Sequence, residues 1–336
     1  MHALRNWAAR TFMGIGLTGL LGSGAQVLAA DYDGSPQVTE FITEMTRDYG
    51  FASEQLVNLF AEVQRKQAIL DAISRPAERV KPWKEYRPIF ITDKRIAQGV
   101  DFWRKNQAAL EKAEADYGVP AQFIVAIIGV ETFYGGNTGS YRVMDALSTL
   151  AFDYPPRAPF FRKELREFLM LTREEQVDPL SLKGSYAGAM GLPQFMPSSF
   201  RAYAVDFDGD GHINIWNNPT DAIGSVASYF QRHGWQAGGQ VASRAQVSGE
   251  RVDEGLTEGL DPVKSVGELR ALGWHSADVL ADDVPVTAFR LEGAEGDEYW
   301  LGLPNFYVIT RYNRSVMYAM AVNQLAELLV QARGKQ

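Results

Sequence analysis

A single glutamate at the end of an apolar segment is the first residue whose type and position could support acid–base chemistry. Glu131 lies in GVETFYGG, where the apolar segment 120–130 meets a glycine-rich turn. Burial disfavours the ionised form of a carboxyl group and raises its pKa, so a glutamate in this setting stays protonated near neutral pH. A protonated carboxyl can donate to a glycosidic oxygen. Position alone leaves an equal alternative, in which Glu131 only caps or pairs with a neighbour at the helix end.

A segment rich in small residues follows at 184–200, with the sequence GSYAGAMGLPQFMPSSF. Its small residues permit close approach of the backbone, and Ser185, Tyr186 and Gln194 offer hydrogen bonds to a polar ligand. Glycines also serve packing. Taken alone, this segment therefore favours the plainer interpretation of a tight turn between helices.

The spacing of acidic residues in DFDGDGHINIWN, residues 206–217, is typical of a calcium-binding loop. Asp206, Asp208 and Asp210 occupy the first, third and fifth places of such a loop, and Gly211 occupies the sixth. Three carboxylates this close would repel one another without a cation, which disfavours the alternative of a plain acidic surface turn. The sequence therefore predicts bound Ca²⁺.

The second half of this loop departs from the usual calcium pattern. Its twelfth place holds Asn217 rather than a bidentate glutamate. Asp221 could close the coordination sphere instead, with the carbonyl oxygen of His212 as a further ligand. We expect the ion to be structural, bracing the loop and a helix that begins near Thr220.

Composition disfavours several other chemistries. The chain has no cysteine, and its predicted mature part keeps only His212, His233 and His275, which are not paired at zinc-binding spacing. No GxSxG nucleophile motif or phosphate-binding loop occurs. A net charge of -8 and a pI near 5.2 argue against a nucleic-acid partner, because neutralising phosphates requires a basic face. Calcium is thus the cofactor that the sequence predicts, with no organic cofactor.

The elements that must position these residues are mainly helical. Apolar residues recur at helical spacing over 38–45 and again over 56–63, the latter behind a predicted Ser53 cap. The stretch KPWKEYRPIF, residues 81–90, contains two prolines and predicts an extended connection. Residues 95–236 favour helices again, and 120–130 is apolar all round, which predicts a buried helix whose carboxyl end carries Glu131.

The last third of the chain changes character. Residues 240–300 are charged and rich in turns, and VPVTAFRLEG (284–293) and EYWLGL (298–303) predict short strands of a small α+β insertion. The remaining residues return to helical spacing. The predicted fold class is therefore α+β, mainly α, with a helical core, an N-terminal helical region and short antiparallel strands.

The amino terminus predicts a cleaved signal peptide. Arg5 and Arg10 precede an apolar run over 12–21, and cleavage is expected after Ala29 or Ala30. The run is shorter than the roughly 20 residues of a membrane-spanning helix, and without cysteine no lipid anchor can follow it. We expect a soluble periplasmic protein with no transmembrane segment in its mature chain.

Taken together, the motifs resemble the B family of bacterial lytic transglycosylases. The resemblance extends over nearly the whole mature chain and rests on segments in the same order: KPWKEYRPIF, GVETFYGG, FDYPPRAPFF, SYAGAMGLPQFMPSSF, the calcium loop, DAIGSVASYFQRHGW and RYNRSVMYAMAV. It implies a lysozyme-like core and cleavage of the bond between N-acetylmuramic acid and N-acetylglucosamine in peptidoglycan. It also implies that Glu131 acts as acid and then as base, leaving a 1,6-anhydromuramic end.

The resemblance further assigns binding residues. It implies that Ser185 and Gln194 contact the Glu131 region or the sugar. It implies glycan-groove positions at Tyr86, Arg157, Tyr229, Tyr312, Asn313 and Tyr318. It implies calcium ligands at Asp206, Asp208, Asp210, His212 and Asp221. One departure is Thr132, where other lytic transglycosylases often have serine. For tyrosines at helical spacing, a place in the core is an equal alternative.

The predicted domain organisation and the functions in competition follow from these observations. The segments are a signal peptide (1–30), an N-terminal helical region and connection (31–95), a catalytic core with the calcium loop (96–239), an α+β insertion (240–303) and a returning C-terminal segment (304–336). A hydrolytic muramidase and a non-catalytic calcium-dependent glycan-binding protein are the alternatives. Expected partners are peptidoglycan strands and proteins of cell-wall synthesis or remodelling.

Overall fold

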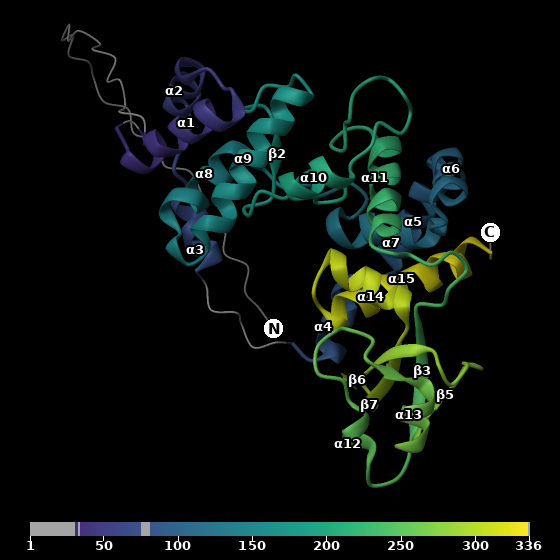
Figure 1. Cartoon of the computed structure of the whole chain (residues 1–336). Helices are drawn as coiled ribbons and strands as arrows, with labels where there is room; N and C mark the ends of the chain where they lie inside the picture. Colours follow the sequence, from purple (N-terminus) through teal and green to yellow (C-terminus); the bar gives the residue numbers. More distant parts are fainter. Residues whose placement is uncertain (1–30, 33, 75–80, 335–336) are drawn as a thin grey trace, which may run out of the picture.

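The computed structural model describes residues 31–32, 34–74 and 81–334. The predicted signal peptide, residues 1–30, lies outside these residues. Figure 1 shows helices gathered in the upper part of the molecule and a small sheet at its lower end, with α14 (Pro304–Tyr312) and α15 (Val316–Arg333) between them.

The N-terminal helices bury the apolar residues that their spacing predicted. They are α1 (Pro36–Tyr49), α2 (Ser53–Ala61) and α3 (Gln67–Ile73). The buried residues of α1 are Val38, Phe41, Ile42 and Met45. The predicted cap at Ser53 is wrong, because Ser53 is the first helical residue and the position before it is Ala52, which has no side-chain cap.

The predicted extended connection at 81–90 is wrong, because Trp83–Phe90 forms the helix α4 with Pro88 inside it. A proline in a helix loses one backbone hydrogen bond and clashes with the preceding turn. Tertiary contacts offset that cost: Trp83 is buried, and Nε of Arg87 donates a hydrogen bond of 2.6 Å to Oε1 of Gln324 in α15. The helix packs against α15 (Val316–Arg333) and β6 (Pro285–Gly293).

The central helices range from short turns to α9, which has 17 residues. They are α5 (Asp93–Lys105), α6 (Gln107–Tyr117), α7 (Ala121–Thr132), α8 (Val143–Asp153), the 3-10 helix η1 (Pro155–Arg157), α9 (Ala158–Glu174), α10 (Pro197–Tyr203), α11 (Pro219–Arg232) and α14 (Pro304–Tyr312). A two-stranded sheet joins β1 (Tyr141–Arg142) to β2 (Lys183–Gly184).

The predicted helix at 120–130 is confirmed as α7, which is buried on all sides between α5, α6, α11 and α15. Within the described residues, no single helix has the length and apolar character to cross a membrane. The pair α6 and α7 passes that test together, but the two helices meet at 116°. The apolar surface of α7 is used in the core of the protein.

The two predicted strand segments, 284–293 and 298–303, correspond to β6 and β7 of an antiparallel sheet of order β4-β6-β7-β3-β5. The strands are β3 (Ala242–Val247), β4 (Lys264–Ser265), β5 (Trp274–Ser276), β6 (Pro285–Gly293) and β7 (Gly296–Gly302), with α12 (Val252–Gly255) and α13 (Val266–Ala271) between them. A small core around Trp274 and Leu269 supports the sheet. Phe289 of β6 stacks on Phe306 of α14 with ring centroids 5.0 Å apart, which joins the sheet to the helices.

Candidate active site

Glu131 lies in the last turn of α7, directly before an unusual helix end. Phe133 and Tyr134 both adopt the left-handed conformation, with φ of 54° and 60°, which is costly for residues other than glycine. The ring of Tyr134 fits a slot formed by two glycines. A Cβ atom would lie 2.3 Å from the Tyr134 hydroxyl oxygen at Gly99 and 2.6 Å from it at Gly129. Close packing thus holds the strained turn behind Glu131.

The residue after Glu131 joins α7 to the segment 184–200. The hydroxyl oxygen of buried Thr132 lies 3.0 Å from the carbonyl oxygen of Leu192 and 3.2 Å from that of Ile128, and it accepts a hydrogen bond from the backbone N–H of Gly135. The backbone N–H of Leu192 donates to the carbonyl oxygen of Ile215 in the acidic loop. A continuous set of hydrogen bonds therefore connects the three motifs that the sequence singled out.

The carboxyl group of Glu131 has an acid–base character suited to neutral pH. Burial raises the pKa of Glu131 to about 7, although a hydrogen bond from the Tyr318 hydroxyl opposes this rise. Burial also raises the pKa of Tyr86, and the nearby charge of Glu131 raises it further. The same two causes, in the same order, raise the pKa of Tyr312. Three tyrosines from α4, α14 and α15 thus surround one carboxyl group.

A cavity of about 490 Å³ opens at Glu131. Ser185 and Gln194, both predicted site residues, line it. The hydroxyl oxygen of Ser185 accepts hydrogen bonds from the backbone N–H groups of Ala187 and Ala189, and Nε2 of Gln194 donates to the carbonyl oxygens of Thr138 and Gly191. These bonds shape the loop that forms one wall of the cavity.

The other predicted groove residues lie in different surroundings. The hydroxyl of half-buried Tyr312 donates to the carbonyl oxygen of Pro193. Asn313 is exposed just after α14, and Arg157 is exposed in η1 with its guanidinium 4.4 Å from the ring centroid of Phe160. Neither Asn313 nor Arg157 lines the Glu131 cavity.

Tyr229 is buried among other aromatic rings and does not line the Glu131 cavity. It is 7% exposed, and its hydroxyl donates to the carbonyl oxygen of Arg311. Its ring stacks on His233, with centroids 4.0 Å apart, and packs against Tyr312. Tyr229 therefore supports Tyr312 from behind.

Sequence reasoning missed several residues that line the Glu131 cavity. They follow Glu131 in the chain and are Gly136, Asn137, Thr138, Gly139, Ser140 and Tyr141. The signal was present in the glycine-rich stretch GGNTGSY, which was treated only as a turn. The close approach of this stretch to the opposite wall explains one of its glycines, since a Cβ at Gly139 would lie 2.1 Å from the carbonyl oxygen of Gly184.

The acidic loop brings three carboxylates together. Oxygen atoms of Asp206, Asp208 and Asp210 lie within 4.8 Å of one another. Backbone N–H groups of Gly211 and Gly209 donate to Asp206, and these bonds lower its pKa. A set of carboxylate oxygens at the loop surface is the ligand chemistry that Ca²⁺ prefers, so the residues fit this ion.

Asp221 lies beside these three aspartates, and its side chain also accepts hydrogen bonds from the backbone of the loop. Its Oδ1 accepts a hydrogen bond from the backbone N–H of Phe207 and its Oδ2 accepts one from Asn214, each at 2.8 Å. Burial raises the pKa of Asp221, and the charges of Asp208 and Asp206 add to the rise. Asp221 therefore ties the two ends of the loop together. The helix that follows, α11, begins at Pro219, with Asn218 as its cap.

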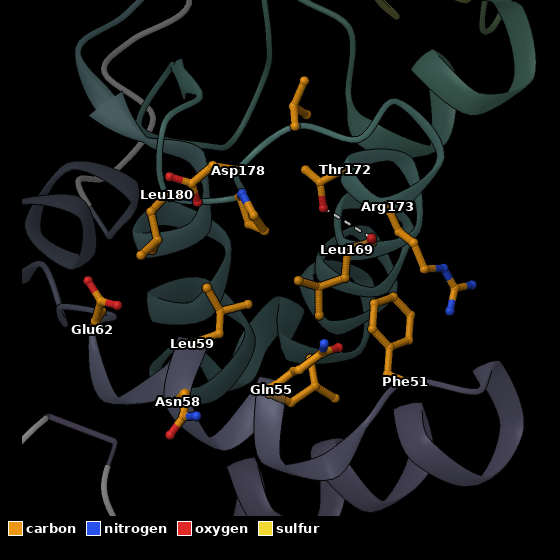
Figure 2. Close-up of a pocket in the computed structure, with 13 residues that line it drawn as sticks. Phe51, Gln55, Asn58, Leu59, Glu62, Leu169, Thr172, Arg173, Asp178 and Leu180 are labelled. Carbon is orange, nitrogen blue, oxygen red and sulfur yellow. Dashed lines mark hydrogen bonds between the residues drawn. The ribbon is translucent and has the colours of Figure 1, made fainter.

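Another cavity, of about 370 Å³, lies between α2 and the end of α9 (Figure 2). Leu59, Leu169 and Phe51 form much of its surface, and the hydroxyl of Thr172 is occupied by a hydrogen bond to the carbonyl oxygen of Leu169. Its acidic residues, Glu62 and Asp178, are both exposed. This cavity lacks a buried carboxyl group and is a poor candidate for acid–base chemistry.

Comparisons with known proteins agree with the geometry. The model of the family described as transglycosylase SLT domain matches residues 33–327. The membrane-bound lytic murein transglycosylase B of Escherichia coli (strain K12) is 45% identical over 315 residues, which cover 91% of this chain and 86% of the relative. Catenated lytic transglycosylase SltB1 from Pseudomonas aeruginosa superimposes with a TM-score of 0.88 and 73% identity, covering 90% of this chain and all of that chain. The Escherichia coli lytic transglycosylase SLT35 in complex with calcium superimposes with a TM-score of 0.84 and 45% identity, covering 91% of this chain and 96% of that chain.

Proposed function

The chain belongs to the transglycosylase SLT domain family and is a peptidoglycan lytic transglycosylase, and we propose that Glu131 is its single catalytic acid and base. The fold is α+β, mainly α, with the lysozyme-like helical core of its structural neighbours. The observation that carries the proposal is the largely buried side chain of Glu131, with its pKa raised to about 7, in the wall of a cavity. A carboxyl group with this pKa can both give and take a proton at neutral pH.

The proposed reaction has two proton transfers. Protonated Glu131 donates its proton to the oxygen between N-acetylmuramic acid and N-acetylglucosamine, and the bond from that oxygen to the muramic C1 breaks. The resulting carboxylate then removes the proton from the muramic 6-hydroxyl, whose oxygen bonds to C1 and closes the 1,6-anhydro ring. Glu131 ends protonated, as it began. The hydrogen bond from Tyr318 stabilises the carboxylate between the two transfers.

The cavity supports an internal attack rather than attack by an enzyme carboxylate. Among the described residues that line it, Glu131 alone carries a carboxyl group. Most glycosidases need a second carboxylate as nucleophile or base, whereas an intramolecular hydroxyl removes that need. This observation favours the transglycosylase over the hydrolytic muramidase.

The sugar is proposed to contact Ser185 and Gln194 in the loop wall and Tyr86, Tyr312 and Tyr318 around the acid. The support for this assignment is that all five lie at the cavity or beside the Glu131 carboxyl. Arg157 and Asn313 are exposed and are proposed to contact sugars further along the strand. Tyr229 is proposed to act only through Tyr312, against which it packs.

The acidic loop is proposed to hold a structural Ca²⁺. Asp206, Asp208 and Asp210 would supply carboxylate ligands, with the carbonyl oxygen of His212 and a free lone pair of Asp221 completing the set. The relative SLT35 in complex with calcium supports this assignment. Bound calcium would relieve the mutual repulsion of the carboxylates and keep the loop in place against Leu192.

The protein is proposed to act in the periplasm after removal of residues 1–30, with peptidoglycan strands as its substrate. The support is the arrangement of charged, apolar and small residues at the amino terminus. Its relative in Escherichia coli is described as membrane-bound.

The decisive experiment is mass spectrometry of the muropeptides released from purified sacculi by the wild type and by Glu131→Gln. We expect 1,6-anhydromuramic ends from the wild type and none from Glu131→Gln, with glycan binding retained. Reducing ends would show a muramidase. Equal release by both proteins would exclude Glu131 as the acid.

A further inference from the structure

The side chain of Arg95, in the first turn of α5, contacts two aromatic rings from different parts of the chain. Its Cζ atom lies 4.7 Å from the ring centroid of Phe133 and 5.4 Å from that of Phe90. A guanidinium within about 6 Å of a ring centroid is attracted by the face of the ring. Nη1 of Arg95 also donates a hydrogen bond of 2.6 Å to the carbonyl oxygen of Ile89. One side chain therefore connects the end of α4 to the turn that follows α7.

Both segments that Arg95 contacts have unfavourable local structure. The helix α4 has eight residues and contains Pro88. The last carbonyl groups of a helix have no partner within it, and a cation near them is favourable. Phe133, at the end of α7, adopts the left-handed conformation with φ of 54°. Arg95 thus supports the backbone in two places where local sequence does not.

The guanidinium of Arg95 is held in a partly buried position. Its backbone N–H donates to the side-chain oxygen of Thr92, the cap of α5, which fixes the first turn of that helix. Burial lowers the pKa of Arg95, although the nearby Tyr134 opposes this change. Removing a cation from water costs free energy. The two rings and the Ile89 carbonyl offset part of that cost.

The segments that Arg95 joins lie on two sides of Glu131. The ring of Phe90 lies 5.1 Å from that of Tyr86, centroid to centroid, and Tyr86 is close enough to Glu131 for the charge of the carboxylate to raise its pKa. Phe133 follows Glu131 by two residues. A continuous series of contacts therefore leads from Tyr86 through Phe90 and Arg95 to the turn behind Glu131.

We propose that Arg95 is a positioning residue for Glu131, because it holds α4 and the turn after α7 together and so keeps Tyr86 over the carboxyl group. The proposal rests on the proposed function, in which Glu131 is the acid. Arg95 does not line the Glu131 cavity, so it acts through Phe90 and Phe133 rather than on the sugar. Its loss lets α4 move away and admits water to Glu131. The pKa of Glu131 then falls below about 7, because burial is the main cause of its rise.

The pH dependence of kcat/KM tests this role with Arg95→Gln. We expect the alkaline limb to move to lower pH by roughly half a unit to one unit, with a loss of roughly two- to fivefold at pH 7 that shrinks toward pH 5. A purely electrostatic role predicts the opposite shift, because removal of a nearby cation raises the pKa of a carboxyl group. Arg47→Gln is the matched control, since Arg47 is exposed and pairs with its neighbour Asp48. An unmoved limb, or one moved to higher pH, would overturn the proposal.

Two further variants keep the test valid if Arg95→Gln does not fold. Arg95→Lys keeps the charge but loses the planar group, and we expect a smaller shift of the limb in the same direction. Phe133→Leu removes one ring and leaves Arg95 in place, and we expect it to move the limb to lower pH as well. Wild-type profiles for both variants would overturn the proposal.

Hydrogen–deuterium exchange provides a measurement that does not depend on turnover. We expect the backbone amides of α4, residues 83–90, to exchange roughly five- to tenfold faster in Arg95→Gln than in Arg47→Gln. Equal exchange in the two variants would show that Arg95 does not hold α4. Wild-type activity of Glu131→Gln would instead contradict the proposed function, and the exchange rates would still report on the contact between Arg95 and α4.

Discussion

The hydroxyl of Tyr318 donates a hydrogen bond of 2.5 Å to Oε1 of Glu131, across a sequence separation of 187 residues. The two residues affect one another in opposite senses. The hydrogen bond lowers the pKa of Glu131, whereas burial and the nearby Glu131 raise that of Tyr318. Burial has the larger effect on Glu131, and the pKa of about 7 is the balance between the two.

Removal of this hydrogen bond is expected to shift the pH dependence of the reaction. In Tyr318→Phe the carboxylate loses a donor, so the pKa of Glu131 rises above about 7. The alkaline fall of kcat/KM, which follows deprotonation of the acid, moves to higher pH, and kcat falls by about tenfold. A pH–rate profile measures both. Tyr229→Phe is the control, because its hydroxyl donates to Arg311; an unmoved alkaline limb in Tyr318→Phe would contradict the prediction.

The raised pKa of Glu131 also predicts a stability effect. The folded protein binds this proton more tightly than the unfolded chain, so stability falls as pH rises from about 4.5 to about 7 and is then constant. Glu131→Gln is therefore expected to be more stable than the wild type at pH 8 by up to about 3 kcal/mol, and equally stable at pH 4. Urea unfolding at the two pH values tests this. A difference that does not depend on pH would argue against a raised pKa.

Thr132 is expected to keep the loop wall in place next to Glu131. Thr132→Val has nearly the same volume but leaves the carbonyl oxygen of Leu192 without its partner, which costs about 1–3 kcal/mol in the free energy of unfolding. Thr132→Ser keeps the hydroxyl and should keep most of the stability and activity. Thermal unfolding and turnover rates of Thr132→Val and Thr132→Ser test whether this hydrogen bond matters. If Thr132→Val behaves like Thr132→Ser, the hydrogen bond is unimportant.

Calcium is expected to stabilise the fold through the acidic loop. At a free concentration of about 100 times Kd, a ligand of the folded state adds roughly 2.7 kcal/mol, so chelation should lower the Tm of the wild type by several degrees. Asp206→Asn/Asp210→Asn should lose the response to calcium. A wild-type Tm that is independent of calcium would refute the site.

Two substitutions in the slot that holds the Tyr134 ring are expected to change the stability of the protein in opposite directions. The buried hydroxyl of Tyr134 has no hydrogen-bond partner among the described residues, so Tyr134→Phe should be neutral or stabilising by up to about 1 kcal/mol. Gly129→Ala places a Cβ 2.6 Å from that hydroxyl and should destabilise by about 1–3 kcal/mol. Gly129→Ala should also lower activity, because the Tyr134 ring holds the turn that follows Glu131. Equal stability of the two variants would show that the slot is not tightly packed.

Some features of this protein were decided by local sequence. Asp206, Asp208 and Asp210 come together because alternate residues of one short loop face the same point, whatever the rest of the chain does. The segment 120–130 predicts α7 for a similar reason: an all-apolar run of that length is stable as a helix only when it is buried, and its end then carries Glu131 into the interior.

Other features were decided only by tertiary structure. Tyr86 and Tyr318 meet Glu131 from α4 and α15, and no local pattern encodes contacts between segments so far apart in the chain. Tyr229 shares its residue type with them, but its hydroxyl donates to the carbonyl oxygen of Arg311 and its ring packs against Tyr312, so the packing of the helices decides which tyrosine lies beside Glu131. The helix α4 forms despite Pro88, since the burial of Trp83 against the rest of the protein outweighs the local cost of the proline. Local spacing therefore determined the acidic loop and the helix that carries Glu131, while the surroundings of Glu131 required the folded chain.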